Sequence, residues 1–234
     1  AALAKLKGDW QPLSDPIALL VGNYVHSYFE DLTVHEKFKE ENKNRMFSSR
    51  KPYGLLKDFK IAEQMIDRLI VEDAFLNLYQ GEKEVIVTGE IGGAMWKGKI
   101  DCLNLEEKYF VDIKTTKDMH EKKWDERLNR KANFIERFGY VLQMAVYCEL
   151  LRQQYDKNFL PLIAAISKQT PSEAKLITLS EEKMKYELEE LKENIEHVVQ
   201  VKNGEEAPVS CGTCEYCRGH NKITKIGRAS CRER

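Results

Sequence analysis

The stretch "GKIDCLNLEEKYFVDIKTT" (residues 98–116) predicts two β-strands separated by a polar turn. Each strand carries a carboxylate among apolar neighbours, Asp101 in the first and Asp112 in the second, and Lys114 follows two residues later. A charge within such a strand is costly unless an opposite charge or a metal ion compensates it. These three residues therefore indicate a site and decide which fold is expected around it.

A hairpin centred between Glu106 and Glu107 places Asp101 opposite Asp112, where facing Cβ atoms lie about 4.5–5.5 Å apart. Side chains alternate along a strand, so Lys114 lies on the same face as Asp112. Two carboxylates this close repel each other, and a hard cation such as Mg²⁺ relieves the repulsion. With a lysine beside them, they predict metal-assisted phosphodiester hydrolysis. The alternative is a structural ion pair between Asp101 and Lys114.

Composition sets broad limits on the function. The chain has 234 residues, 42% of them hydrophobic, and a net charge of −1, which neither indicates nor excludes a nucleic-acid partner because a local basic patch suffices. No apolar run approaches the roughly 18–20 residues that a membrane span needs. The first ten residues are too short and interrupted for a secretory signal. We therefore expect a cytoplasmic protein without a membrane partner.

Apolar periodicity and turn residues predict four helices, at 17–39, 58–79, 133–155 and 180–202. Short β-branched or aromatic runs predict strands, the first three as an antiparallel meander, at 84–91, 95–104, 108–115, 159–167 and 174–180. The resulting order ααβββαββα predicts an α/β fold with a mixed central β-sheet flanked by helices. We expect one domain over residues 1–225, followed by a non-native or disordered tail over residues 226–234.

Two helical motifs strengthen the prediction of a site. In GNYVHSYFE, Gly22, His26 and Glu30 recur every fourth residue on one helix face, and an imidazole there can ligate a metal. In QMAVY, Gln143 and Tyr147 lie one turn apart on an otherwise apolar helix. The alternatives are an ordinary surface or core histidine, and a glutamine and tyrosine whose polar ends are satisfied by hydrogen bonds in the core.

Together these motifs resemble the PD-(D/E)XK nuclease superfamily and its RecB-like branch, which has a G-x3-H-x3-E helix, a G-x-I-D strand, a D-x-K strand and a Q-x3-Y helix in this order. The similarity spans about residues 15–220 and is greatest to the RecE-type exonucleases, exodeoxyribonuclease VIII and its phage relatives. It implies a restriction-endonuclease-like core and a 5′-to-3′ exonuclease acting on double-stranded DNA ends. It also implies a homo-oligomeric ring and a RecT-type single-strand annealing protein as partner.

The resemblance also implies roles for individual residues. Mg²⁺, or Mn²⁺ in its place, would be held by the side chains of His26, Asp101 and Asp112 and by the Ile113 carbonyl. Lys114 would activate the attacking water, Gln143 would orient Lys114 or the DNA end, and Tyr147 would contact the DNA backbone. The acidic residue of D-x-K is Asp rather than the commoner Glu, but the shorter carboxylate still binds Mg²⁺.

Basic residues near these motifs are candidates for DNA contact, with a solvated loop or helix as the alternative for the segment after Lys114. The candidates are Lys97, Lys99, Lys117, Lys122, Lys123, Trp124, Arg127, Arg130 and Lys131.

The C-terminal segment 211–220 carries three cysteines at metal-ligand spacing, Cys211, Cys214 and Cys217. They could hold Zn²⁺ or an iron–sulfur cluster, need a fourth ligand from elsewhere, or be reduced structural thiols. Some RecB-like nucleases build such a cluster from one early and three late cysteines, whereas no cysteine here precedes Cys102. Cys231, in the basic tail, is assigned no role.

Two other functions remain open. The first is another RecB-like activity, such as that of an endonuclease or a helicase-associated nuclease. The second is a catalytically silent nuclease fold that binds DNA, although the complete set of Asp101, Asp112 and Lys114 speaks against it.

Overall fold

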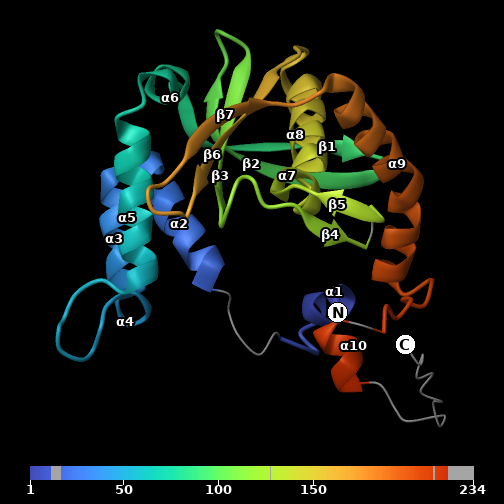
Figure 1. The fold of residues 1–234 in the computed structure, drawn as a ribbon. Coiled ribbons are helices and arrows are strands. Elements are labelled where there is room, and N and C mark those ends of the chain that lie inside the picture. Colours follow the sequence, from blue (N-terminus) through green and yellow to red (C-terminus); the bar gives the residue numbers. More distant parts are fainter. Residues whose placement is uncertain (12–16, 127, 213, 221–234) are drawn as a thin grey trace, which may run out of the picture. The chain divides into compact units, whose positions relative to one another are not determined.

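A computed structural model of the chain describes residues 1–11, 17–126, 128–212 and 214–220 (Figure 1). The predicted DNA contact Arg127, the tail 226–234 and Cys231 lie outside the described residues. Contacts between Cα atoms divide the chain into two compact units. The larger unit is Pro16–Glu196, and the other combines the two ends of the chain, Ala1–Asp15 and His197–Arg234.

The larger unit is built on a five-stranded mixed sheet with the order β1-β2-β3-β6-β7. The strands are β1 (Glu82–Ile91), β2 (Ala94–Asn104), β3 (Tyr109–Thr116), β6 (Leu160–Ser167) and β7 (Ala174–Thr178). β3 and β6 pair in parallel, and every other neighbouring pair is antiparallel. This confirms the predicted α/β fold with a mixed central sheet, and the predicted meander is β1-β2-β3.

Helices cover both faces of this sheet (Figure 1). On one face, Tyr24 and Phe59 pack with Val111 and Ile113 of β3; they belong to α2 (Ile17–Glu30) and α5 (Lys57–Ile70). On the other face, Phe110 of β3 packs with side chains of α8 (Tyr140–Tyr155) and of the first part of α9 (Glu181–Asn203). Because both faces of these strands are covered, β6 is almost continuously apolar and β3 is buried from Phe110 to Ile113, which makes the buried charge of Asp112 unusual.

The predicted helix over 17–39 is wrong in its continuity, because the chain breaks at Asp31. The Asp31 carboxylate accepts hydrogen bonds from the backbone N–H groups of Thr33 and Val34 and so begins a new helix, α3 (Leu32–Glu41). Such an N-cap side chain accepts hydrogen bonds from N–H groups that would bond to backbone carbonyls if the helix were continuous. The polar segment that follows contains a further short helix, α4 (Lys43–Met46).

Two other predicted helices are also interrupted. The region 58–79 forms α5 and a separate α6 (Asp73–Leu78). The region 133–155 forms α8 and, before it, α7 (Phe134–Arg137), which Asn133 and Glu136 start with a capping box. Gly139 lies between the two at φ 67°, a backbone conformation that favours glycine and turns the chain.

The segment between β3 and α7, for which a solvated loop or helix was the alternative to a DNA contact, contains a small antiparallel hairpin that was not predicted. Its strands are β4 (Lys123–Asp125) and β5 (Arg130–Ala132). The end unit contributes the remaining described helices, α1 (Ala2–Leu6) and α10 (Glu215–His220).

Candidate active site

The two strand carboxylates meet where β2 and β3 stop pairing. Pairing runs from Asn104↔Tyr109 to Cys102↔Val111, and the next position in this register sets Asp101 against Asp112. There the Asp101 side chain takes the place of a backbone acceptor, because its Oδ2 accepts a hydrogen bond of 2.7 Å from the N–H of Ile113. The exposed fractions are only 6% for Asp101 and 1% for Asp112. The hairpin register thus sets two buried carboxylates opposite each other, as the sequence predicted.

His26 reaches this point from α2. Its Nδ1 lies 3.1 Å from Asp101 Oδ2. Burial alone would lower the pKa of His26, but the nearby Asp101 carboxylate outweighs it and the pKa lies above its ordinary value. Burial would likewise raise the pKa of Asp101, but His26 and the Ile113 N–H hold it below its ordinary value. The structure therefore brings the histidine of the helical motif next to the Asp101 carboxylate.

Lys114 pairs with the second carboxylate. Its Nζ lies 2.5 Å from Asp112 Oδ2 and 4.7 Å from the centre of the Tyr140 ring. Burial and the negative charge of Asp101 raise the pKa of Asp112 to about 6, although Lys114 opposes the rise. The cation–π contact between Lys114 and Tyr140 was not predicted. The alternative of an ion pair between Asp101 and Lys114 is not what the structure has, because Lys114 pairs with Asp112 and Asp101 pairs with His26.

Gln143 and Tyr147 lie on α8, which packs over the face of the sheet that carries Asp112. The Gln143 amide donates a 2.8 Å hydrogen bond to the Tyr147 hydroxyl, so the two polar side chains of the motif contact each other. Tyr147 also explains the glycine of the G-x-I-D motif. A Cβ on Gly98 would lie 2.7 Å from the Tyr147 ring, so only glycine lets the ring approach β2.

The donor set fits a hard divalent cation. Ile113 directs its N–H toward β2, and the carbonyl of a residue in an extended strand points to the same side as its N–H. That carbonyl therefore faces the stretch of β2 where pairing has ended. Carboxylate and carbonyl oxygens are the ligands that Mg²⁺ prefers, and an imidazole adds a nitrogen that suits Mn²⁺. Asp112, Asp101, His26 and Ile113 could hold such an ion.

Glu84 of β1 is a further acidic residue at the site, and the sequence reasoning missed it. One ligand atom from each of His26, Glu84 and Asp101 lies within 4.8 Å of the others. Pairs Lys83↔Cys102 and Val85↔Ile100 flank it, so Glu84 faces Asp101 across the sheet. A hairpin centred on Gly92 and Gly93 sets Glu84 opposite Asp101. Applying the pairing argument to this preceding hairpin as well would therefore have found Glu84 from the sequence.

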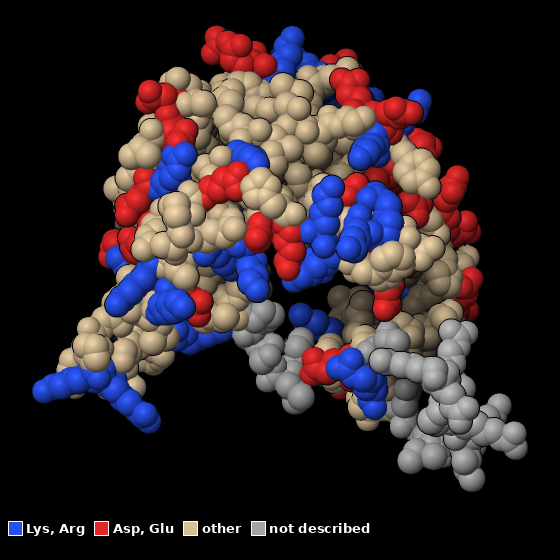
Figure 2. All heavy atoms as spheres, in the orientation of Figure 1, with Lys and Arg blue, Asp and Glu red and all other residues tan. Residues whose placement is uncertain are grey.

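The predicted DNA-contacting residues fall into two groups. Lys122, Lys123, Trp124 and Lys131 are exposed on or beside the β4–β5 hairpin, and Figure 2 shows Lys and Arg side chains gathered over this hairpin. Trp124 is 59% exposed, unusually high for a tryptophan without a partner surface. Arg130 is committed elsewhere, since its guanidinium forms two hydrogen bonds with the Glu136 carboxylate.

The second group lies on β2 and just beyond β3. Lys97, Lys99 and Lys117 are all exposed. The Lys99 ammonium forms an ion pair with Glu84, which ties this predicted DNA contact to the buried acidic residues.

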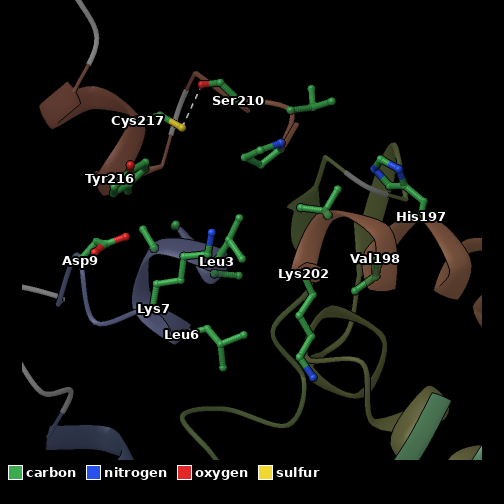
Figure 3. A pocket seen from close by; sticks show the side chains of 16 residues that line it. Leu3, Leu6, Lys7, Asp9, His197, Val198, Lys202, Ser210, Tyr216 and Cys217 are labelled. Carbon is green, nitrogen blue, oxygen red and sulfur yellow. Dashed lines mark hydrogen bonds between the residues drawn. The ribbon is translucent and has the colours of Figure 1, made fainter. Parts of the chain in front are cut away.

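The three cysteines converge within the end unit. One Sγ from each of Cys211, Cys214 and Cys217 lies within 4.8 Å of the others, and the described cysteines form no disulfide. Backbone N–H groups of Cys214 and Cys217 point at the preceding thiols. The Ser210 hydroxyl donates a 3.1 Å hydrogen bond to Cys217 Sγ and lowers the pKa of that thiol (Figure 3).

Beside them lies a cavity of about 810 Å³, lined mainly by apolar side chains that include Leu3, Leu6, Val198 and Tyr216 (Figure 3). None of the residues of the candidate active site lines it. Across the described part of the chain, no helix has the length and apolar content needed to cross a membrane.

Comparisons with known proteins agree with this geometry. A family model described as "PDDEXK-like domain of unknown function (DUF3799)" matches residues 1–220. A crystal structure from Eubacterium rectale, described as a "putative exonuclease", is 33% identical with a TM-score of 0.86, and the match covers 97% of this chain and 82% of that one.

A solved structure described as SSO0001 is 15% identical with a TM-score of 0.31, over 87% of this chain and 94% of that one. A comparison with curated proteins gives no match. On the family model and the 33% identical structure, the chain belongs to the PDDEXK-like family DUF3799.

Proposed function

We propose that this protein is a Mg²⁺-dependent exonuclease that degrades linear double-stranded DNA from 5′ to 3′. It would leave 3′ single strands for recombination by annealing. One observation carries the nuclease proposal: Asp101, Asp112, Lys114 and His26 meet at the end of the β2–β3 ladder. The similarity to the E. rectale protein described as a "putative exonuclease" supports the same activity. The direction of degradation rests on the resemblance to RecE-type enzymes.

The residues divide the work between holding the cation and placing the reactants. Asp101, Asp112, His26 and the Ile113 carbonyl would hold the ion, which supplies a Lewis acid for a phosphoryl oxygen. Lys114 is fixed between the Asp112 carboxylate and the Tyr140 ring, so its ammonium can donate a hydrogen bond to the attacking water from a defined position.

The α8 pair and the basic hairpin would act on the DNA. The Tyr147 hydroxyl accepts from Gln143, which leaves its own hydrogen free to donate to a phosphate oxygen. On the β4–β5 hairpin, Lys123 and Lys131 would contact phosphates and Trp124 would stack on an unpaired base.

End-labelled linear DNA and closed circular DNA, each with Mg²⁺ or with EDTA, test the activity. We expect loss of linear DNA only with Mg²⁺, and release of a 5′ label before a 3′ label. Cutting of circles would instead support an endonuclease. Binding without any cleavage would support a silent DNA-binding module.

The assembly and the partners are further parts of the proposal. A homo-oligomeric ring and a RecT-type annealing protein follow from the resemblance, and the mass of the particle in solution tests the ring. A monomeric mass at micromolar concentration would remove that part while leaving the nuclease proposal in place.

We also propose that the three cysteines of the end unit bind a thiophilic metal, as Zn²⁺ or an iron–sulfur cluster. Their sulfur atoms are already gathered without a disulfide, and two backbone N–H groups stabilise the negative charge of thiolates. Three thiolates supply one ligand fewer than a closed structural site needs, so a fourth ligand must come from elsewhere.

A further inference from the structure

Glu84 has a backbone conformation that a glutamate rarely adopts. Its φ is 55°, in the left-handed region, although it lies within the extended strand β1. A Cβ makes this conformation unfavourable, so it persists only where its surroundings impose it. In this case it holds the carboxylate beside His26 and Asp101, with the Glu84 side chain only 15% exposed.

The strand opposite is irregular at the same place. Ile100 and Leu103 pack in the apolar cluster under α8, whereas Cys102 packs in the cluster under α2. Regular alternation would put Ile100 and Cys102 on one face, so β2 departs from alternation next to Asp101. Irregularities in both strands thus turn Glu84 and Asp101 toward one another, where their charges repel unless a cation lies close by.

That cation is the Lys99 ammonium in this structure. Lys99 pairs with Glu84, and its side chain is 60% exposed, in contrast to Lys114, whose side chain is 12% exposed. The three carboxylates of Glu84, Asp101 and Asp112 therefore lie near two ammonium groups of very different exposure. A divalent ion entering among them can displace Lys99 into solvent, while Lys114 stays enclosed.

We propose that Glu84 is a further ligand of the catalytic cation, and that Lys99 neutralises the Glu84 carboxylate until the cation binds. The inference rests on the proposed metal-dependent function and adds a means of loading the site. Binding of the ion exchanges one positive charge for another at Glu84. The same exchange frees Lys99 for a DNA phosphate, so metal binding and DNA binding become coupled through one side chain.

Calorimetric titration of Mn²⁺ into the full chain, without DNA, tests this. We expect Glu84→Gln to weaken Mn²⁺ binding at least tenfold and Lys99→Met to tighten it several-fold. Glu84→Asp separates ligation from a general effect of charge, because it keeps the charge but shortens the reach, and we expect it to weaken binding nearly as much as Gln. Glu82→Gln and Lys185→Met, both at exposed positions without an assigned role, are the matched controls and should stay within twofold.

A second readout counts the waters bound to Mn²⁺ by proton relaxation. Loss of a protein ligand adds about one water in Glu84→Gln, whereas Lys99→Met leaves the number unchanged. Circular dichroism checks that each variant is folded. Wild-type affinity and hydration in folded Glu84→Gln would overturn the inference and leave the nuclease proposal intact. Weakened Mn²⁺ binding in that variant, in a protein that cleaves no DNA, would support the inference while the nuclease proposal failed.

Discussion

The strongest quantitative prediction concerns Asp112, the more deeply buried of the two hairpin carboxylates. The perturbation is Asp112→Asn, which keeps the size of the side chain and removes its charge. In the fold, burial and the Asp101 carboxylate raise the pKa of Asp112 from 3.8 to about 6. The folded chain therefore binds this proton more tightly than the unfolded chain does.

The sign and size follow from linkage. A raised acid pKa contributes stability that is fully present below pH 3.8 and is lost as the pH rises through about 6. Each pKa unit corresponds to about 1.4 kcal/mol. As the pH rises, the free energy of unfolding of the wild-type protein therefore falls by up to about 3 kcal/mol, whereas Asn does not titrate and causes no such fall in the variant. Between pH 4.5 and 7.5 the difference in free energy of unfolding should move by about 2 kcal/mol in favour of the variant.

The assay is urea unfolding of both proteins in EDTA at several pH values. The variant also loses the ion pair with Lys114, which adds an offset, so the change of the difference with pH is the quantity that matters. Asp67→Asn, on an exposed position of α5, is the control for removing a carboxylate. A difference that stays flat from pH 4.5 to 7.5 would refute the reasoning about Asp112.

Mg²⁺ supplies a second arm of the same experiment. An ion that binds only the folded state at 100 times its dissociation constant stabilises it by about 2.7 kcal/mol. At pH 7.5, saturating Mg²⁺ should therefore stabilise the wild type far more than Asp112→Asn.

Three further predictions follow from the site and the surfaces around it. Lys114→Met should reduce DNA cleavage by at least about a hundredfold in protein that circular dichroism shows to be folded, and Lys185→Met on α9 should leave cleavage unchanged; a fully active Lys114→Met enzyme would remove the assigned role. The double variant Lys123→Ala, Lys131→Ala should weaken DNA binding for all sequences and reduce the slope of log affinity against log salt by about two; an unchanged slope would mean that the hairpin does not contact phosphates. Anaerobically purified protein should contain Zn or Fe by elemental analysis, and Cys217→Ser should lose it; metal-free wild-type protein would identify the cysteines as structural thiols.

The sequence predicted the sheet well because each of its strands carries a strong local signal. β-branched and aromatic residues separated by glycine or polar turns identify the five strands. The turn at Glu106–Glu107 determines the register, which places Asp101 opposite Asp112. Helix boundaries were predicted less well. A helical period continues through Asp31, and only the competition between its side chain and the helix backbone decides that the chain breaks there.

The site was predicted in part, for a related reason. His26, Asp101, Asp112 and Lys114 could be found from spacing within one element or one hairpin. Glu84 comes to the site from a strand whose own pattern looks ordinary, and Tyr140 lies on α8 three residues before Gln143, outside the predicted pair. Their roles depend on tertiary packing, which periodicity within a segment does not contain.

The pairing of charges at the site argues that function, rather than stability, accounts for this hairpin. Buried ion pairs rarely stabilise a fold more than well-packed apolar residues of the same volume. At this site three carboxylates each lie beside a separate partner, His26 for Asp101, Lys114 for Asp112 and Lys99 for Glu84. An apolar residue at any of these strand positions would continue the core that surrounds it. The arrangement instead keeps acidic oxygens gathered at the open end of a strand pair, which is what a cation-dependent reaction on a phosphodiester requires.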